Sequence, residues 1–494
     1  MPAITRSRGS ASSAQERRAL TAPSASTPSR AFIRDLFLRL LGVVFFVAFL
    51  SLLAQATLLF GREGLLPAQD FLRTPRGFLD APTIFWLGAS DGTLRAGAIV
   101  GAVLSLGLVL NLAPRYCLAL LWALYLSFVT VGQDFLAFQW DNLLLETAVC
   151  ALFVAPGGLR PRAAPPPHPL AVFLMLWLVF RIHVESGAAK LLLGDPSWRD
   201  LTAMATYYET APLPTWIGWW AHQMPLWAHR ACGVFVYGVE LGLPLLIWGP
   251  RRLRAAVFAG MVAMQVAVLA TANYGFFNYL SMALALWVLD DGHLGRAAVP
   301  REPPRRSLVL PIALPVLVAL SVIEFLPFLH PPPGLEGHLL PVRRALAPFR
   351  SINSYHLFAH MTLVRREAVI EGSADGADWL PYEFRYKPGD PARPPPFVAP
   401  HQPRVDFQLW FLLLGPRPGA RYFDALLARL LTAPEVVAPL FARDPFPATP
   451  PRFVRVAIYR YRFTDLATRH PTGAWWQREL EGRSRPLDAE GIRR

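Results

Sequence analysis

Four ionisable side chains fall within ten residues at the end of a long apolar run. Arg181, His183, Glu185 and Lys190 close the stretch PLAVFLMLWLVFRIHVESGAAK, 169–190. On a helix, steps of three and four place His183 and Lys190 on one face, and Arg181 and Glu185 form an i,i+4 pair on another. Ionisable groups inside a membrane span are costly and are candidates for function. A desolvated lysine is suited to act as a base or nucleophile; the alternative is that Lys190 reaches the interface or pairs with a carboxylate.

A second polar group opens another apolar run, FQWDNLLLETAVC, 138–150. Asp141 is a good helix-capping residue, so capping explains it without any function. Glu146 lies one turn further inside the apolar run and needs a buried partner. The candidate partners are Lys190, His183 and Arg181. If the chain is an enzyme, we expect Lys190 to be the base, assisted by His183 or Glu146.

An aromatic and proline-rich segment, 198–227, follows the first stretch. Trp and Tyr favour the membrane–water interface, so the segment is predicted to be interfacial and partly re-entrant. The functional alternative is an aromatic lid over a cavity at the outer ends of the helices. Glu240, in VFVYGVELGLPLLIW, is a further acid that we expect to be buried near this segment.

The composition is that of a membrane protein. Hydrophobic residues make up 53% of the 494 residues and charged residues only 17%, against about 25% in soluble domains. The net charge of +14 comes largely from Arg clusters between apolar runs, which is typical of cytoplasmic loops and argues against nucleic-acid binding. The three cysteines show no metal-ligand or redox spacing, so no metal site is predicted. No hydrolase or nucleotide-binding motif is present either.

Residues 31–330 are predicted to form a helical membrane domain of about eight or nine spans, after a disordered basic tail at 1–30. With that tail in the cytoplasm, nine spans place the Arg-rich short loops on the cytoplasmic side, and the part after residue 330 is then extracytoplasmic. The expected spans are 37–60, 96–112, 117–133, 141–155, 169–192, 231–249, 253–272, 274–289 and 308–328.

The chain changes character after residue 330. A Pro-rich linker is expected at 331–340, followed by a soluble α+β domain with an antiparallel sheet at 341–494. AVIEG and YEFRY read as strands around an Asp-Gly loop, and RFVRVAIYRYRF alternates as a half-exposed strand should. DFQLWFLLL and YFDALLARLL read as short amphipathic helices.

Several longer stretches resemble the lipase maturation factor family. They occur in matching order over 36–480. They are LLGVVFFVAFLSLLAQ…GREGLLP (41–67), FQWDNLLLETAV (138–149), FRIHVESGAAKLLLGDPSWRDLTAMATYYETAPLPT (180–215), ANYGFFNYL (272–280), NSYHLFAHMT (353–362), IEGSADGADWLPYEFRYKPGD (370–390), PPPFVAPHQPRVDFQLWF (394–411) and FVRVAIYRYRFT (453–464).

The resemblance implies a multi-pass membrane protein that matures secreted proteins such as lipases through its C-terminal domain. It implies the endoplasmic reticulum membrane, or the inner membrane in a bacterium, and no cofactor. The client-binding side chains are then expected to include Trp379, Tyr382, Arg404 and Asp406. The sequence leaves the oligomeric state and the client open.

A more distant likeness suggests an alternative. SGAAKL followed by a Trp is similar to the lysine segment of vitamin K-dependent γ-carboxylase, in which the matching lysine is a base toward a quinol. That likeness implies a membrane enzyme that uses a lipid-soluble quinol and Lys190. A transporter would call for matched broken helices or an inverted repeat, which the sequence does not show.

Overall fold

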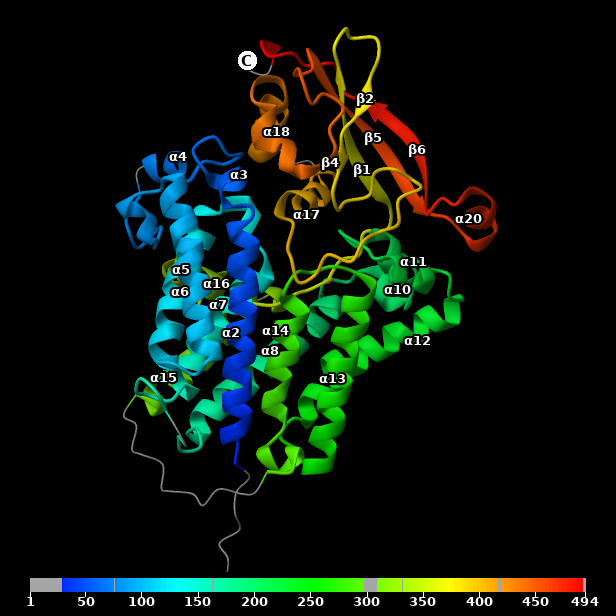
Figure 1. Cartoon of the computed structure of the whole chain (residues 1–494). Coiled ribbons are helices and arrows are strands. Elements are labelled where there is room, and N and C mark those ends of the chain that lie inside the picture. Colours follow the sequence, from blue (N-terminus) through cyan, green and yellow to red (C-terminus); the bar gives the residue numbers. More distant parts are fainter. Residues whose placement is uncertain are drawn as a thin grey trace, which may run out of the picture.

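The computed structural model describes residues 29–74, 76–161, 164–296, 309–330, 332–415 and 420–491. A bundle of helices forms one half of the molecule, and a domain built around a β-sheet sits on one end of it (Figure 1). Most of the predicted tail, 1–28, lies outside the described residues. Arg30, at its end, packs against the bundle, where its Nε donates to the Leu289 carbonyl at 2.8 Å.

The helical half contains long apolar helices and several short ones. They are α2 (Ala31–Leu53), α3 (Ala56–Phe60), α4 (Ala68–Arg73), α5 (Asp91–Val109), α6 (Pro114–Val131), α7 (Gln139–Val154), α8 (Pro169–Leu192), α9 (Pro196–Arg199), α10 (Ala203–Thr210), α11 (Trp216–His222), α12 (Leu226–Tyr237), α13 (Arg251–Thr271), α14 (Phe277–Ala285) and α15 (Leu310–Phe325). A π-helical turn, Gly238–Gly242, continues α12.

The expectation of a multi-pass helical membrane domain is confirmed. Within the described ranges, six helices are long and apolar enough to cross a membrane, namely Ala31–Leu53, Asp91–Val109, Pro114–Val131, Pro169–Leu192, Arg251–Thr271 and Leu310–Leu329. The other three predicted spans correspond to shorter helical segments: α7 has 16 residues, α14 with its last turn is Phe277–Val288, and α12 is interrupted by the π-helical turn. Helices α7 and α14 are mostly buried, so their hydrophobicity reflects protein contacts as well as lipid, whereas α12 buries only His229 and Gly233.

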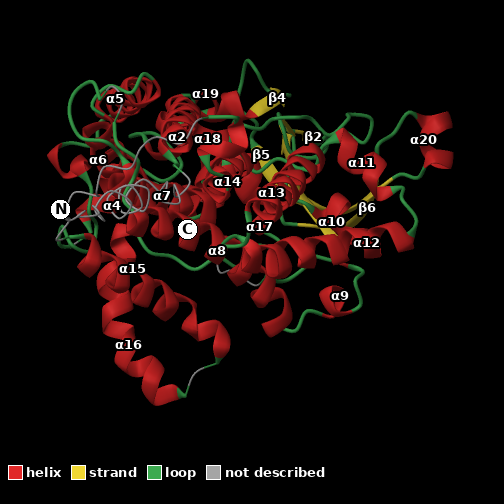
Figure 2. Cartoon of the chain, turned by 90° about the horizontal axis from the view of Figure 1, so that it is seen from below, coloured by secondary structure: helices red, strands yellow, loops and turns green. Residues whose placement is uncertain are grey.

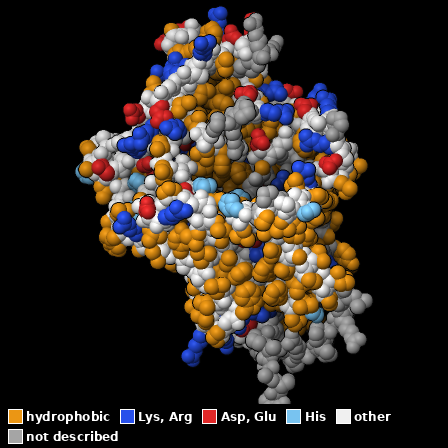
Figure 3. Space-filling view, turned by 180° about the vertical axis from the view of Figure 1, so that it is seen from behind, with side chains coloured by type: hydrophobic (Ala, Val, Ile, Leu, Met, Phe, Trp, Pro, Cys, Tyr) orange, Lys and Arg blue, Asp and Glu red, His pale blue; other side chains and the backbone are white. Residues whose placement is uncertain are grey.

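The character of the molecular surface changes at the boundary between the helical half and the sheet-bearing half. Hydrophobic side chains cover the helical half, whereas charged side chains gather on the sheet-bearing half and at the opposite tip (Figure 3). Val103 on α5 and Ile312 on α15 are more than 60% exposed, as is Leu110, which follows α5 directly. Such a wide apolar surface is expected where lipid replaces water as the solvent.

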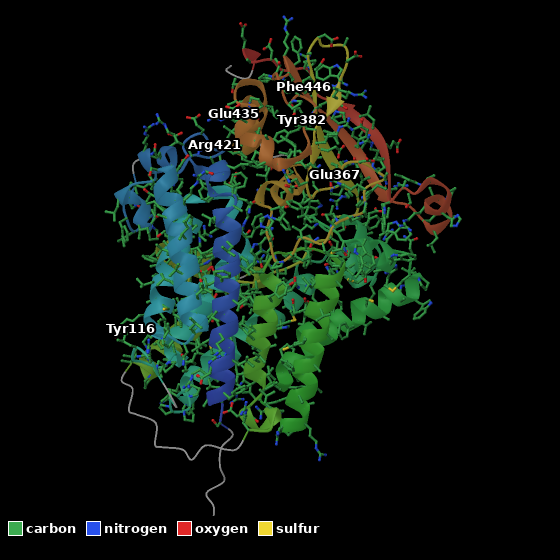
Figure 4. The ribbon with its side chains drawn as sticks, in the orientation of Figure 1. Tyr116, Glu367, Tyr382, Arg421, Glu435 and Phe446 are labelled. Carbon is green, nitrogen blue, oxygen red and sulfur yellow. The ribbon has the colours of Figure 1, made fainter. Side chains whose placement is uncertain are left out.

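The two ends of the bundle carry different groups. The Ala31 end of α2 lies at the end away from the sheet (Figure 1). Helices α13 and α6 also begin at that end, and Tyr116, in the first turn of α6, is labelled there in Figure 4. The sheet domain is thus on the opposite side of the bundle from the beginning of the first helix, as the charge pattern of the loops predicts.

The predicted linker is mostly helical. Residues Pro333–Leu346 form α16, which with α15 projects sideways from the bundle (Figure 2). Pro333 occupies the first turn, where the missing N–H costs nothing, so a proline-rich start favours rather than prevents a helix here. Most of the Pro-rich linker predicted at 331–340 thus forms the first part of α16.

The C-terminal half contains the predicted antiparallel sheet. Four strands pair in the order β2-β1-β5-β6, and β3 pairs with β4 in a small second sheet. The elements are β1 (Arg365–Ser373), β2 (Leu380–Pro381), β3 (Glu383–Phe384), α17 (Arg404–Phe411), α18 (Arg421–Thr432), α19 (Pro434–Val437), β4 (Phe441–Arg443), β5 (Phe453–Phe463), α20 (Leu466–Thr472) and β6 (Trp476–Arg483). Helices α17 and α18 pack beside β1 and β5 and bury their apolar faces there.

The Asp-Gly hairpin is confirmed for AVIEG, but its second strand is Leu380–Pro381; Glu383 and Phe384, within YEFRY, form β3, which pairs with β4. Strands β1 and β2 pair antiparallel, with Gly372 opposite Leu380. Gly376 adopts a φ of +82°, which favours glycine, and its N–H donates to the Ser373 hydroxyl. The alternation in RFVRVAIYRYRF becomes β5, which buries Val454, Ala457 and Tyr461.

Polar contacts join the two halves. Asn273, in the turn between α13 and α14, accepts from the N–H groups of Val398 and Ala399 at 2.7 and 2.9 Å. On α2, the Ser51 hydroxyl lies 2.9 Å from His401 Nδ1. These contacts dock the loop before α17 onto the end of the bundle.

Candidate functional site

Helix α8 carries the four ionisable residues at the end of the long apolar run, Arg181, His183, Glu185 and Lys190. It begins at Pro169, whose fixed φ suits the first turn, and the His168 side chain caps the helix by accepting from Leu170 N. Its apolar first half is followed by the polar stretch near its C-terminal end, which lies at the sheet side of the bundle. Arg181 and Lys190, which lie on different sides of α8, have separate sets of partners.

Arg181 is the centre of a buried ion cluster. Its Nη1 donates to Glu146 Oε1 at 2.6 Å, and its Nε donates to Glu185 Oε1 at 2.9 Å. All three side chains are at most 6% exposed. The predicted i,i+4 pair of Arg181 and Glu185 is confirmed. Of the three candidate partners for Glu146, the ion partner in the structure is Arg181.

The cluster is completed from outside the bundle, by residues 353–355. The backbone N–H and the amide of Asn353 each donate to Glu146 Oε2 at 3.0 Å, and the Tyr355 hydroxyl donates to the same oxygen at 2.8 Å. Tyr355 N donates to Glu185 Oε2 at 2.9 Å. Burial, followed by the charge of Glu146, raises the pKa of Tyr355 well above 10, so the phenol stays a donor. These donors compensate for two carboxylates that share one guanidinium.

Lys190 pairs with Glu240. Its Nζ lies 2.9 and 2.8 Å from the two carboxylate oxygens and donates to the Leu357 carbonyl at 2.8 Å and the Ser186 carbonyl at 3.3 Å. The π-helical turn that holds Glu240 packs closely against α8 at Gly187, where an added methyl group would lie 2.8 Å from Leu241. Glu240 is therefore the buried acid that the sequence predicts.

The three candidate catalytic residues fall into two groups. Lys190 and His183 line a cavity of about 70 Å³ between α8, α10, α12 and α13. Glu146 does not line it, because it belongs to the Arg181 cluster. Spacing on α8 places the first two residues on one face, but the packing of α7 on α8 brings Glu146 to Arg181 and to neither of them.

The aromatic segment 198–227 closes the sheet-side end of this cavity. Trp198 and Met204 line it, and Trp198 Nε1 donates to the Phe358 carbonyl at 2.8 Å. Trp227 is 73% exposed and Trp216 is 42% exposed at the other end of the segment. One part thus lies over the cavity and the other has the exposed aromatic residues expected at a membrane interface.

Asp141 is not the residue that caps α7. The helix is capped at Phe138, without a side-chain hydrogen bond, and Asp141 lies in the first turn. Its oxygens accept from Arg404 Nη1 and Nη2 at 2.6 and 2.8 Å, and from the Tyr125 hydroxyl at 2.6 Å. The capping interpretation overlooked this bidentate ion pair because its partner is 263 residues away.

Three of the four candidate client-binding residues are buried in the described structure. Arg404 is held by Asp141, and Tyr382 packs in the sheet domain 4.9 Å, centroid to centroid, from the Phe441 ring. Asp406 accepts from the N–H groups of Tyr386 and Lys387 at 2.9 and 3.0 Å. Burial raises the pKa of Asp406, and these two N–H donors partly counter that effect. Their contacts are structural, since a client cannot reach them without a rearrangement.

Trp379 lies on the surface side of the β1–β2 hairpin. Its ring is half-buried, and Arg455 of β5 stacks over it at 4.0 Å from the centroid. The indole N–H donates to the Gly376 carbonyl at 3.2 Å. Of the four candidates, Trp379 is thus the one placed where a partner can touch it.

A second buried ion cluster was not anticipated. Glu367 on β1 pairs with Arg365 at 2.6 Å and with Lys387 at 2.8 Å, and it is labelled in Figure 4. Arg365 also donates to the carbonyls of Glu209, in the last turn of α10, and of Pro212, just after that helix. The signal in the sequence was the spacing of Arg365 and Glu367, which places both on one face of a strand.

Comparisons with known proteins match both halves of the molecule. Residues 32–296 match the lipase maturation factor transmembrane domain, and residues 351–486 match the lipase maturation factor C-terminal domain. The first range covers the bundle from α2 to α14, and the second covers the sheet domain. No solved structure matches the chain.

Curated relatives match over most of their length. Lipase maturation factor 2 of Homo sapiens is 34% identical over 90% of this chain and 81% of its own length. Lipase maturation factor 1 of Bos taurus is 32% identical over 93% of this chain and 90% of its own, and that of Mus musculus is 32% identical over 91% and 86%. The chain, an integral membrane protein, belongs to the lipase maturation factor family.

Proposed function

We propose that this protein is a membrane-anchored maturation factor that assists the folding and assembly of secreted proteins such as lipases. The observation that carries the proposal is the match of both family domains, in order, to the two halves of the structure. The relatives' names refer to lipase maturation, and the bundle supplies the anchor while the sheet domain supplies the surface for a client.

The geometry supports a client-binding surface held in a fixed position above the bilayer. Arg404 joins α17 to Asp141 of the bundle, and residues 353–355 complete the Arg181 cluster. Buried ion pairs with full hydrogen bonding specify one arrangement of the parts they join, which here are the two halves of the molecule. The β1–β2 hairpin then lies at the end of the sheet domain away from the bundle (Figure 1).

Lipase maturation in cells tests this function. We would co-express a secreted lipase with the full chain in cells that lack their own maturation factor, and measure the specific activity of the secreted enzyme. Wild-type chain should raise this activity over an empty vector. No increase for any secreted lipase tested, at normal expression and membrane assembly, would contradict the proposed client class.

A pair of variants tests the client surface. Trp379→Ala should reduce lipase activation several-fold if the hairpin touches the client, because aromatic side chains dominate protein interfaces. Leu466→Ala is the matched control, since Leu466 is 52% exposed on α20 of the same domain. Equal activation by both variants would place the contact elsewhere on the domain.

The membrane and the side on which the sheet domain lies form part of the same proposal. We place the protein in the endoplasmic reticulum membrane of a eukaryotic cell, or the inner membrane if its host is bacterial, with the sheet domain extracytoplasmic. A protease added to sealed vesicles should leave a tag at the C-terminus intact and remove one at the N-terminus. Cleavage of the C-terminal tag in sealed vesicles would reverse the placement.

The alternative, a quinol-dependent enzyme with Lys190 as base, rests on the position of Lys190 beside a cavity. The contacts of Lys190 weaken it. The ammonium group is engaged by Glu240, the Leu357 carbonyl and the Ser186 carbonyl, and while these contacts hold the nitrogen offers no lone pair. Assistance from Glu146 would also need Glu146 to leave Arg181.

A further inference from the structure

One ring nitrogen of His183 has a hydrogen-bond partner, and the other has none among the described residues. Nδ1 lies 2.8 Å from the Val179 carbonyl, which can only accept, so Nδ1 carries the proton. In the neutral ring, Nε2 is then an acceptor with a free lone pair. Nε2 is buried and finds no partner among the residues that the structure describes. Buried polar atoms are nearly always paired, so this one requires an explanation.

The free nitrogen belongs to a residue that lines the 70 Å³ cavity. Much of the wall opposite α8 is apolar, with Met204, Val236 and Val268 among its residues. The other charged groups in the lining, Lys190 and Glu240, neutralise each other. The lining also contains the Tyr207 hydroxyl, which lacks a partner among the described residues, and the Gln265 side chain, whose Oε1 accepts from Asn278 Nδ2 at 2.9 Å. Because the Lys190–Glu240 pair contributes no net charge, the cavity disfavours an anionic headgroup.

The apolar wall is next to the lipid-facing surface of the bundle. Val236 on α12 and Val268 on α13 are half-buried, while their neighbours Val234 and Val266 are 56% and 50% exposed. Helix α12 is followed directly by the π-helical turn that carries Glu240, and such turns often mark functional sites. A ligand that reaches the cavity between α12 and α13 would come from the bilayer.

We propose that this cavity binds the hydroxyl group of an uncharged lipid amphiphile. The hydroxyl donates its hydrogen to Nε2 of His183, and the first part of the alkyl chain lies against Val236 and Val268. The chain continues toward the bilayer between α12 and α13. This site is independent of the client-binding surface, which lies on the sheet domain.

Photolabelling of the full chain in lipid nanodiscs tests the site. The probe is a long-chain primary alcohol with a diazirine in its chain, and the comparison probe is its methyl ether, which has no donor. The alcohol should label residues of α12 and α13 beside the cavity, as mapped by mass spectrometry. The ether should label them about tenfold less, because one buried hydrogen bond is lost.

Variants separate the hydrogen bond from the cavity. His183→Leu should reduce labelling by the alcohol to the level of the ether. Val236→Phe keeps His183 but fills the cavity, and it should also abolish preferential labelling by the alcohol. Val234→Phe, two residues away and facing outward, is the matched control and should label like the wild type. Each variant is compared at equal thermal stability and expression.

Other results overturn the proposal. Equal labelling by alcohol and ether in the wild type would mean that only apolar solvation by the bilayer was measured. Labelling that Val234→Phe reduces as strongly as Val236→Phe would place the probe on the outer surface. If neither probe labels the cavity residues, the nitrogen is met by water alone and the lipid site does not exist.

Discussion

The two sides of helix α8 differ in how many of their buried polar groups have a partner within the protein. On the Arg181 side, α7 and residues 353–355 supply partners for both carboxylates and the guanidinium. On the Lys190 side, the ion pair with Glu240 is satisfied, but the neighbouring His183 faces a cavity with a free nitrogen. One polar stretch of sequence therefore builds a structural junction on one side and leaves a place for a ligand on the other.

This difference teaches that a buried charge in a membrane helix need not mark chemistry. Arg181, Glu146 and Glu185 are as costly to bury as any catalytic group, yet their contacts join the bundle to the sheet domain. An unpaired acceptor is the more informative sign, because a folded protein rarely leaves one without reason. The following predictions are ordered by the size of the expected effect.

Arg181→Met should produce the largest effect, because it leaves two carboxylates buried without a cation. We expect a loss of about 4–5 kcal/mol in the free energy of unfolding, enough to prevent assembly in the membrane. Thermal unfolding and size-exclusion chromatography in detergent measure it. Arg344→Met, on the exposed side of α16, is the control and should behave like the wild type. Similar stability of both variants would show that the junction is not structural.

Lys190→Met should cost about 3 kcal/mol, because Glu240 loses its buried partner. The double variant Lys190→Met, Glu240→Leu should regain most of that stability, since it removes both charges. If Lys190 is structural, lipase activation should return with stability in the double variant. A stable double variant that assembles normally but never activates its client would instead support a chemical role for Lys190.

Asp406→Ala should cost about 2 kcal/mol in unfolding free energy, because the N–H groups of Tyr386 and Lys387 lose their acceptor. Asp406→Asn keeps an acceptor oxygen and should cost less. The comparison shows whether this buried carboxylate, like the Arg181 cluster, is held by its donors. A stable Asp406→Ala variant would contradict that interpretation.

The same aspartate predicts a pH dependence. Its pKa is raised in the folded state from an ordinary value of 3.8, so the folded chain holds the proton more tightly than the unfolded chain. The stability that Asp406 contributes is therefore full below pH 3.8 and is lost as the pH rises through the folded pKa. The melting temperature of Asp406→Asn, measured relative to that of the wild type, should therefore be higher at pH 8 than at pH 5. A constant difference would indicate an unshifted pKa.

The smallest effect is expected for a pair on the open face of the sheet. Arg366 and Glu481 lie 2.6 Å apart with side chains 47% and 31% exposed. Replacing both by Gln should change the unfolding free energy by less than about 1 kcal/mol, because water screens such pairs. A loss as large as that of Arg181→Met would remove the contrast between buried and exposed charges on which this ranking depends.

Much of the fold was predictable from local patterns. Apolar runs located the six long helices, and the alternation in RFVRVAIYRYRF located β5. The i,i+4 spacing predicted the pair of Arg181 and Glu185, because helical geometry alone brings them together. We predicted a Pro-rich linker at 331–340, and most of this stretch forms the start of α16, because proline in the first turn favours a helix.

The candidate site was predictable only in its residue types. The sequence by itself determined that Lys190 and His183 share a face of a membrane helix and that Glu146 requires a buried partner. It had no means of showing that Glu146 joins Arg181, that Asp141 joins Arg404, or that Glu240 reaches Lys190 from a π-helical turn. These contacts join residues 35, 263 and 50 positions apart, respectively. Local spacing is set by the geometry of one helix, whereas partners and cavities depend on how several elements pack, and that was decided by the tertiary structure alone.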